Sequence, residues 1–319
     1  RPSNISYFEI DIDDAPLAPL HHASDEQNLA LAIDTIVKQF QKAKRPAVLI
    51  DQDVDRYEVT GVLQAFIDKT QTPYAQMSTG KAILNENQPL YMGVYRGAMS
   101  DEGVQEKIEG ADFLLSVSPR FIEKNSGYYS QNLPEDHLVR MEKDYCFVGF
   151  ECFEGVDIKD VLHALLDKVE ETPQDTTEQE ETKPDYAYQA DGKLSHKNFW
   201  PQVQAFFSEG DLIYAETGSS SEAMSKIVLP ADSKHVASAF WGALGFTLPA
   251  VFGSMLANPY RRHILFIGDG SFQVTAQELS RILYREQNPI IFLINNDGYT
   301  IERYIMGMYK QYNEIPSWN

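Results

Sequence analysis

Two apolar runs in the last third of the chain, residues 263–267 and 290–294, constrain the fold more than any other feature. The first run is followed by Gly268-Asp269-Gly270-Ser271 and the second by Asn295-Asn296-Asp297-Gly298. Asp269 and Asn296 are 27 positions apart, about the spacing that one crossover helix produces between parallel strands. The pattern therefore predicts a β-α-β unit whose two polar turns meet at the carboxyl edge of one sheet, where open α/β sheets bind ligands.

Strand and helix patterns alternate along the rest of the chain as well, which predicts parallel sheets covered by helices on both faces. A helix begins at Ser24, with Gln27 completing a capping box. The other expected helices are 58–69, 102–109, 158–169, 198–207, 275–285 and one after 216–221. The other expected strands are 47–50, 74–77, 112–117, 139–141, 147–148 and 212–215. The fold class is thus α/β, with two three-layer α/β/α domains.

An acidic segment divides the chain into these two domains. Residues 170–185 hold seven acidic residues against one lysine and no aliphatic residue, so the segment cannot bury enough surface to become ordered. We expect a leading segment at 1–23, a middle domain without cofactor at 24–169, a linker at 170–190 and a last domain at 191–319. The linker carries six of the twenty excess negative charges, so the net charge of −20 says little about a ligand.

Composition excludes several classes of protein. With 27 basic and 47 acidic residues, the chain lacks the basic surface that nucleic-acid binding needs. No apolar run approaches the 18 or so residues of a membrane span. Two cysteines make no disulfide framework, which favours a cytoplasmic location. Because the chain begins with Arg1 and ends without a closing helix, we expect a piece of a longer polypeptide; a processed mature protein is the alternative.

The paired turns after the two apolar runs predict a metal and phosphate site. A carboxylate from Asp269 and an amide oxygen from Asn296 are hard oxygen ligands of the kind that Mg²⁺ prefers, together with phosphate groups. Gly270 allows close approach of the backbone, and Ser271 can bind a phosphate. Taken singly, each turn would be ordinary; their spacing favours the site.

These residues resemble the motif of the thiamin-diphosphate-dependent 2-oxo acid decarboxylases, the pyruvate, indolepyruvate and branched-chain enzymes. The similar stretches cover most of the chain outside the linker: 78–86, 91–102, 108–118, 216–221, 241–250, 266–282 and 294–305. The resemblance implies non-oxidative decarboxylation of a 2-oxo acid to an aldehyde and CO₂, with thiamin diphosphate and Mg²⁺ as cofactors. It also implies a homodimer or homotetramer for the intact protein.

The same resemblance implies a role for each matching residue. Mg²⁺ would be bound by Asp269, Asn296 and the main-chain carbonyl of Gly298. The diphosphate would be contacted by Thr217, Ser219, Gly270 and Ser271. Around the cofactor rings, the Gly242 carbonyl would accept from the pyrimidine amino group, Leu244 would support the bend, Ile301 would pack on the thiazolium, and Glu302 would be the catalytic acid/base.

Two of these residues have an ordinary structural alternative. Leu244 is equally well explained as a core leucine in an apolar loop. Glu302 is useful as a proton donor if burial raises its pKa, and such acids typically contribute ~10²–10⁴ in rate. Otherwise it is a surface glutamate that starts a helix with Arg303.

The chain also departs from the family pattern. Members have an N-terminal pyrimidine-binding domain, which supplies a glutamate to the cofactor N1′ and a pair of histidines. His21-His22 resembles that pair but precedes the middle domain, so we interpret it as a decoy. The last elements of the diphosphate domain are expected to be missing, and Glu222 or Ala223 stands where members usually have an aromatic residue. The 319-residue chain is therefore expected to be inactive.

Two alternatives remain open at this stage. The first keeps the cofactor and changes the chemistry, as in relatives of acetolactate synthase or pyruvate oxidase. No G-x-G-x-x-G follows residues 47–50, which counts mildly against flavin binding. The second alternative is a non-catalytic α/β binding or scaffold fragment.

Overall fold

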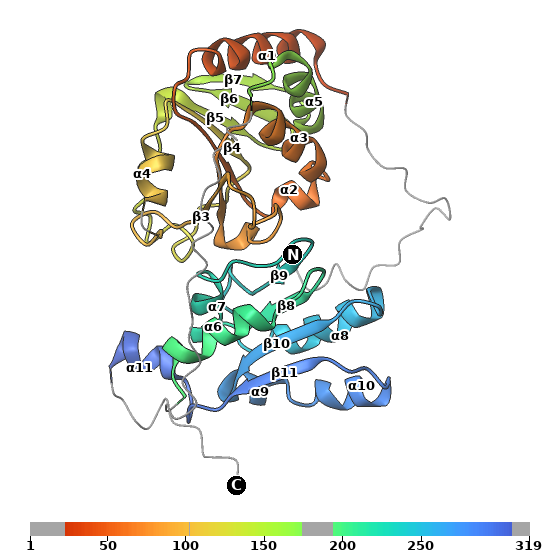
Figure 1. The fold of residues 1–319 in the computed structure, drawn as a ribbon. Helices are drawn as coiled ribbons and strands as arrows, with labels where there is room; N and C mark the ends of the chain where they lie inside the picture. Colours follow the sequence, from red (N-terminus) through yellow and green to blue (C-terminus); the bar gives the residue numbers. More distant parts are fainter. Residues whose placement is uncertain (1–22, 102, 174–193, 308–319) are drawn as a thin grey trace, which may run out of the picture.

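A computed structural model describes residues 23–101, 103–173 and 194–307 of the protein. Two separate sheets are present, each covered by helices (Figure 1). We call residues 24–173, which contain the first sheet, the first domain, and residues 194–307 the second domain. The histidine pair at 21–22 and most of the predicted linker lie outside the described residues, so the predicted domain boundaries stay a prediction.

The first sheet has seven strands in the order β3-β2-β1-β4-β5-β6-β7. Neighbours from β3 to β5 are parallel, whereas β5–β6 and β6–β7 are antiparallel. The α/β class is confirmed, but the expectation of a purely parallel first sheet is wrong at this edge, because tight turns leave no room for crossover helices there. The strands are β1 Pro46–Ile50, β2 Tyr74–Met77, β3 Tyr91–Tyr95, β4 Phe113–Val117, β5 Leu138–Met141, β6 Tyr145–Val148 and β7 Glu151–Glu154.

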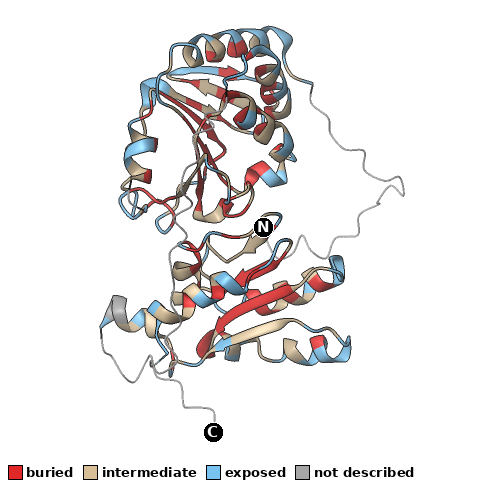
Figure 2. Ribbon diagram, viewed as in Figure 1, coloured by how far each residue is buried: buried red, intermediate tan, exposed pale blue. Residues whose placement is uncertain are grey.

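Helices cover both faces of the first sheet, and the strands alternate between two cores accordingly. Val48 and Ile50 of β1 belong to the core under α1, α3 and α5, while Ala47 and Leu49 belong to the core under α4. Burial follows this arrangement, with the central strands buried throughout (Figure 2). The helices are α1 Glu26–Phe40, α2 Asp53–Arg56, α3 Thr60–Thr70, α4 Val104–Glu109 and α5 Ile158–Lys168.

The second sheet is fully parallel, with the order β11-β10-β8-β9. Its strands are β8 Leu212–Ala215, β9 Lys234–Val236, β10 His263–Gly268 and β11 Ile290–Ile294. One face packs against α6 and α7 and the other against α8 and α10. The helices are α6 His196–Phe206, α7 Ser219–Met224, α8 Thr247–Ala257, α9 Asp269–Thr275, α10 Glu278–Tyr284 and α11 Thr300–Met306.

The side on which successive strands are added to this sheet changes between β8 and β10. After β8 the chain runs outward to β9, and it then returns to the opposite side of β8 to form β10 and β11. Such a switch point opens a crevice at the carboxyl ends of the two strands, which is where ligands bind in open α/β sheets. The topology therefore places the expected ligand crevice between the turn after Ala215 and the turn after Gly268.

Several local details differ from the expectations. The first helix is capped by Asp25, whose side chain accepts from the Asn28 N–H, and Ser24 instead hydrogen-bonds to Asp160 and to the Asp157 N–H. The helix expected at 275–285 is two helices, and the first of them already begins at Asp269.

The two cysteines are free, as expected, but only Cys146 is buried. Burial raises the pKa of its thiol to about 12, which keeps it protonated and inert. Cys152 is exposed. Within the described residues, no helix is both long and apolar enough to cross a bilayer.

Candidate functional site

The predicted metal ligands converge at the ends of β10 and β11. Asp269 is buried, and its carboxylate accepts the Gly270 N–H at Oδ1 and the Gly298 N–H at Oδ2, both over 2.9 Å. These bonds hold the turn after β11 against the start of α9. The 27-residue spacing thus brings the two polar turns together, as the sequence predicted.

The Asn296 amide completes this group. One of its two terminal atoms is 3.2 Å from Asp269 Oδ1 and 2.9 Å from the main-chain oxygen of Gly298. If that atom is nitrogen, it donates to both oxygens; if it is oxygen, it faces both of them across these two separations. Adjacent ligands of an octahedral Mg²⁺ are about 2.9 Å apart, since each lies 2.0–2.1 Å from the ion. With the amide oxygen in that position, the two separations match those of neighbouring Mg²⁺ ligands.

Acidic and imidazole ligands alone would not make a metal site here. Across residues 23–101, 103–173 and 194–307, no group of three or more His, Cys, Asp or Glu side chains is placed to hold a metal ion. A cation at this position would need the amide and main-chain oxygens of Asn296 and Gly298 in addition to Asp269.

The turn after β8 forms the second wall of the crevice. Gly218 has φ 123° and ψ −150°, a conformation open only to glycine. A Cβ added at Gly218 would be 3.9 Å from Ile301 Cγ2, so the Ile301 side chain packs beside this turn. Ser219 follows as the first residue of α7. The predicted residues Thr217, Ser219 and Ile301 thus come from one neighbourhood.

A buried glutamate that the sequence analysis passed over fixes this turn. Glu216 is fully buried, and its carboxylate accepts from the Thr217 N–H and from both the N–H and the hydroxyl of Thr247. These bonds tie the end of β8 to the first turn of α8. A charged residue directly after the apolar strand 212–215 was the available signal for this role.

The loop from Gly242 to Gly245 links the two walls. Gly242 has φ 61° and lies over Thr217, whose Cγ2 would be 3.7 Å from a Cβ on that glycine. Gly245 has φ 77° and accepts a hydrogen bond from the Thr275 hydroxyl, in the helix that starts with Asp269. Leu244 between them is 39% exposed, so it is not a core leucine. It is free to support a ligand.

Gly270 and Ser271, the other predicted phosphate contacts, are buried in the first turn of α9, directly after Asp269. Glu302 lies in the first turn of α11, next to Ile301, with an exposed side chain. This is the position expected of a surface glutamate that starts a helix. The described residues therefore do not provide the burial that a catalytic acid would need there.

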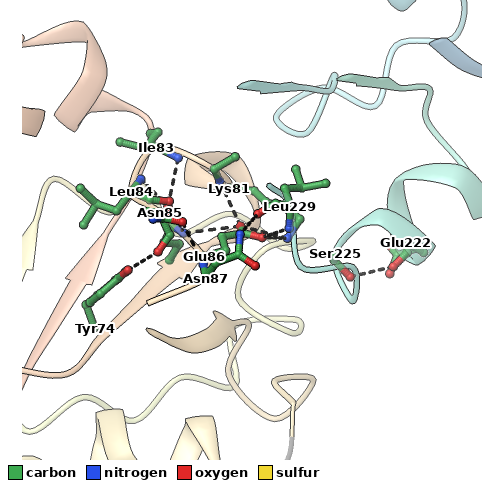
Figure 3. A network of polar contacts seen from close by, with 12 residues as sticks. Tyr74, Lys81, Ile83, Leu84, Asn85, Glu86, Asn87, Glu222, Ser225 and Leu229 are labelled. Atoms are coloured by element: carbon green, nitrogen blue, oxygen red, sulfur yellow. Dashed lines mark hydrogen bonds and ion pairs between the residues drawn. The ribbon is translucent and has the colours of Figure 1, made fainter. Parts of the chain in front are cut away.

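A polar network joins the first domain to the second (Figure 3). Lys81 and Glu86 form a buried ion pair, and Glu86 also accepts the Leu229 N–H over 2.8 Å. Asn87 donates to the Leu229 carbonyl over the same distance. Ala82 packs into the core of the second domain. Partners this far apart in sequence gave no signal that sequence reasoning could have used.

His235 of β9 lines the same interface. The residue as a whole is half-buried, but its Nε2 is enclosed and has no hydrogen-bond partner among the described residues. Burial, together with the smaller effect of the Lys81 charge, lowers the pKa of His235 to about 3. The histidine is therefore neutral in the folded protein at neutral pH.

This histidine predicts a loss of stability in mild acid. Below pH 6.5 the unfolded chain binds a proton that the folded protein refuses, so the free energy of unfolding falls as pH decreases toward 3. Between pH 6.5 and 5 the loss is about 2 kcal/mol, at 1.36 kcal/mol per pH unit. In urea titrations at both pH values, His235→Gln should remove most of this loss. The control His163→Gln, on an exposed position of α5, should lose as much stability as wild type between these pH values. The prediction would be contradicted if the free energy of unfolding of His235→Gln fell with pH as steeply as that of wild type.

Comparison with known proteins gives two family matches. Residues 33–165 match the family "Thiamine pyrophosphate enzyme, central domain", and residues 216–315 match "Thiamine pyrophosphate enzyme, C-terminal TPP binding domain". Pyruvate decarboxylase isozyme 3 of Saccharomyces cerevisiae is 35% identical over 90% of this chain and 52% of its own length. A putative pyruvate decarboxylase of Schizosaccharomyces pombe is 32% identical over 98% of this chain and 57% of its own.

Pyruvate decarboxylase of Candida albicans is 34% identical over 93% of this chain and 54% of its own length. The chain thus spans about half the length of the curated relatives it matches. The two family matches fall on the two domains in the order that the resemblance implied. The chain belongs to the thiamin-diphosphate-dependent 2-oxo acid decarboxylase family.

Proposed function

We propose that the second domain binds thiamin diphosphate through Mg²⁺, as part of an enzyme that decarboxylates a 2-oxo acid to an aldehyde and CO₂. The observation that carries this proposal is the convergence of Asp269, Asn296 and Gly298: one terminal atom of the Asn296 amide lies 3.2 Å from Asp269 Oδ1 and 2.9 Å from the Gly298 oxygen, the spacing of adjacent Mg²⁺ ligands when the amide oxygen takes that position. The names of the relatives make pyruvate the first substrate to test.

The residues around the crevice would divide the work of binding. Asp269, Asn296 and the Gly298 carbonyl would hold the metal, and Thr217, Ser219, Gly270 and Ser271 would hold the diphosphate. The Gly242 carbonyl, Leu244 and Ile301 would orient the rings. When bound, the cofactor supplies the reactive carbon and the electron sink, and the chain positions them.

Glu302 would carry the proton to and from the reacting carbon. Its exposure means that another surface must cover it before its pKa can rise toward neutrality. In this family the active site lies between two chains, so we propose a homodimer or homotetramer for the intact protein. A pyrimidine-binding domain would complete the cover and supply the N1′ glutamate.

Calorimetry and an aldehyde assay test this function. Thiamin diphosphate should bind to the 319-residue chain in the presence of Mg²⁺ and not in the presence of EDTA. With pyruvate, an assay coupled to NADH oxidation by alcohol dehydrogenase should detect no turnover by the 319-residue chain, because the two matched domains are the central and the C-terminal one and neither is proposed to supply the N1′ glutamate. Metal-independent binding would contradict the proposed site, and aldehyde formation would contradict the expected inactivity.

A further inference from the structure

The helix that follows the turn proposed to hold the diphosphate forms an ion pair with the first domain. Arg96, at the end of β3 in the first domain, pairs with Glu222 of α7, one turn after Ser219. We propose that the Arg96–Glu222 ion pair positions the turn at residues 216–219 for the diphosphate. This inference rests on the proposed function, and it makes the first domain a working part of a site to which it contributes no cofactor contact.

The geometry of the pair is that of a specific clamp. Arg96 Nη1 is 2.9 Å from Glu222 Oε2, and Arg96 Nη2 is 3.3 Å from Glu222 Oε1, so the contact is bidentate. The arginine side chain is only 9% exposed, and the glutamate side chain is 38% exposed. Among the described residues, Glu222 is the only carboxylate that this guanidinium contacts. Its Nη2 also donates to the Lys124 carbonyl, and its Nε has no partner there.

Glu222 is connected to the turn by hydrogen bonds to the Gly218 carbonyl. The Glu222 N–H donates to the Gly218 carbonyl over 3.3 Å, and the Ser221 hydroxyl donates to the same carbonyl over 3.0 Å. Glycine has more backbone freedom than any other residue, so the unusual conformation of Gly218 must be maintained by its neighbours. Glu216 restrains the turn on one side, and the ion pair restrains it on the other.

Space and charge also connect the pair to the turn. A cavity of ≈ 40 Å³ between the domains is lined by Arg96 and Glu222 together with Thr217 and Ser221. An unpaired carboxylate on α7 would repel a diphosphate bound nearby. Arg96 neutralises that charge, so it serves both the shape of the turn and its electrostatics.

Single and paired variants test the inference by two readouts. Arg96→Met should weaken thiamin diphosphate binding in the presence of Mg²⁺ about tenfold or more, and Glu222→Gln should weaken it several-fold, because each leaves one charge unpaired. Hydrogen exchange of the amides at residues 219–225 should accelerate about tenfold in both variants without any cofactor. Arg96→Met/Glu222→Leu, which removes both charges, should lie closer to wild type than Arg96→Met alone.

A second ion pair between the domains is the matched control. Lys234 of β9 and Asp55 of α2 are 2.8 Å apart, and among the described residues no hydrogen bond or ion pair joins either of them to the turn. Asp55→Asn should change neither the affinity nor the exchange at 219–225. If wild type binds cofactor and Arg96→Met binds it equally well with unchanged exchange, the inference is overturned while the proposed function stands. If wild type fails to bind, the proposed function fails first.

Discussion

Replacing Asp269 by asparagine is expected to raise the dissociation constant of thiamin diphosphate, measured with Mg²⁺ by calorimetry, by on the order of 100-fold or more. The carboxylate is the one charged group among the three proposed ligands, and an asparagine of the same shape removes that charge. Changes to groups that only support a metal ligand already cost 10–100-fold in affinity, so loss of a ligand should cost at least as much.

The neighbouring aspartate provides the control. Asp297 lies in the same turn as Asn296 and is exposed, and Asp297→Asn removes the same charge without touching the proposed ligands. Its φ of 60° suits asparagine as well as aspartate. We expect affinity within about threefold of wild type for this variant. Equal losses in Asp269→Asn and Asp297→Asn would mean that general electrostatics, rather than metal binding, governs affinity, and would remove the main support for the site.

The part of the site that the sequence predicted is the part built from local patterns. Strands 263–267 and 290–294 are apolar enough to be recognised, and their spacing requires that Asp269 and Asn296 share one edge. Among the elements that escaped this reasoning, β9 and α8 did so for clear physical reasons. β9 is three residues long and contains Lys234 and His235, so it has no apolar signature. α8 is apolar on all sides, which gives no helical period to detect.

The contacts between the domains were beyond sequence reasoning altogether. Arg96 and Glu222 are 126 positions apart, and Glu86 and Leu229 are 143 apart. Neither distance follows from any periodicity, because it depends on how two finished sheets pack. The resemblance indicated only that Glu222 or Ala223 stands where family members usually have an aromatic residue, and it pointed to no partner for either. In the structure, Glu222 forms an ion pair with Arg96.

Glu86→Gln should produce the largest loss of stability of any variant considered, about 3–5 kcal/mol in the free energy of unfolding. Both partners of the Lys81–Glu86 pair are 1% exposed, and the Glu86 carboxylate also accepts the N–H groups of Ala82 and Leu229. Glutamine keeps the shape but leaves the Lys81 ammonium buried without a counter-charge. It also turns an amide N–H₂ toward groups that need an acceptor.

Urea titration followed by two signals should show where this stability is lost. All three tryptophans, Trp200, Trp241 and Trp318, follow the linker, so fluorescence reports on the second domain, whereas far-UV circular dichroism reports on both. The two transitions should coincide in wild type and separate in Glu86→Gln, because Glu86 joins the domains through Leu229. Glu58→Gln, which breaks the exposed pair with Lys159, should cost under about 1 kcal/mol.

Replacing both Lys81 and Glu86 separates the effect of the buried charges on stability from the effect of the contact between the domains. Lys81→Met/Glu86→Leu removes the two buried charges together, so no ion is left uncompensated, and we expect it to recover most of the stability lost in Glu86→Gln. It does not restore the acceptor for the Leu229 N–H, so the two urea transitions should remain apart. If they coincide again, packing rather than this hydrogen bond couples the domains. A loss below 1 kcal/mol in Glu86→Gln itself would show that the ion pair does not stabilise the interface.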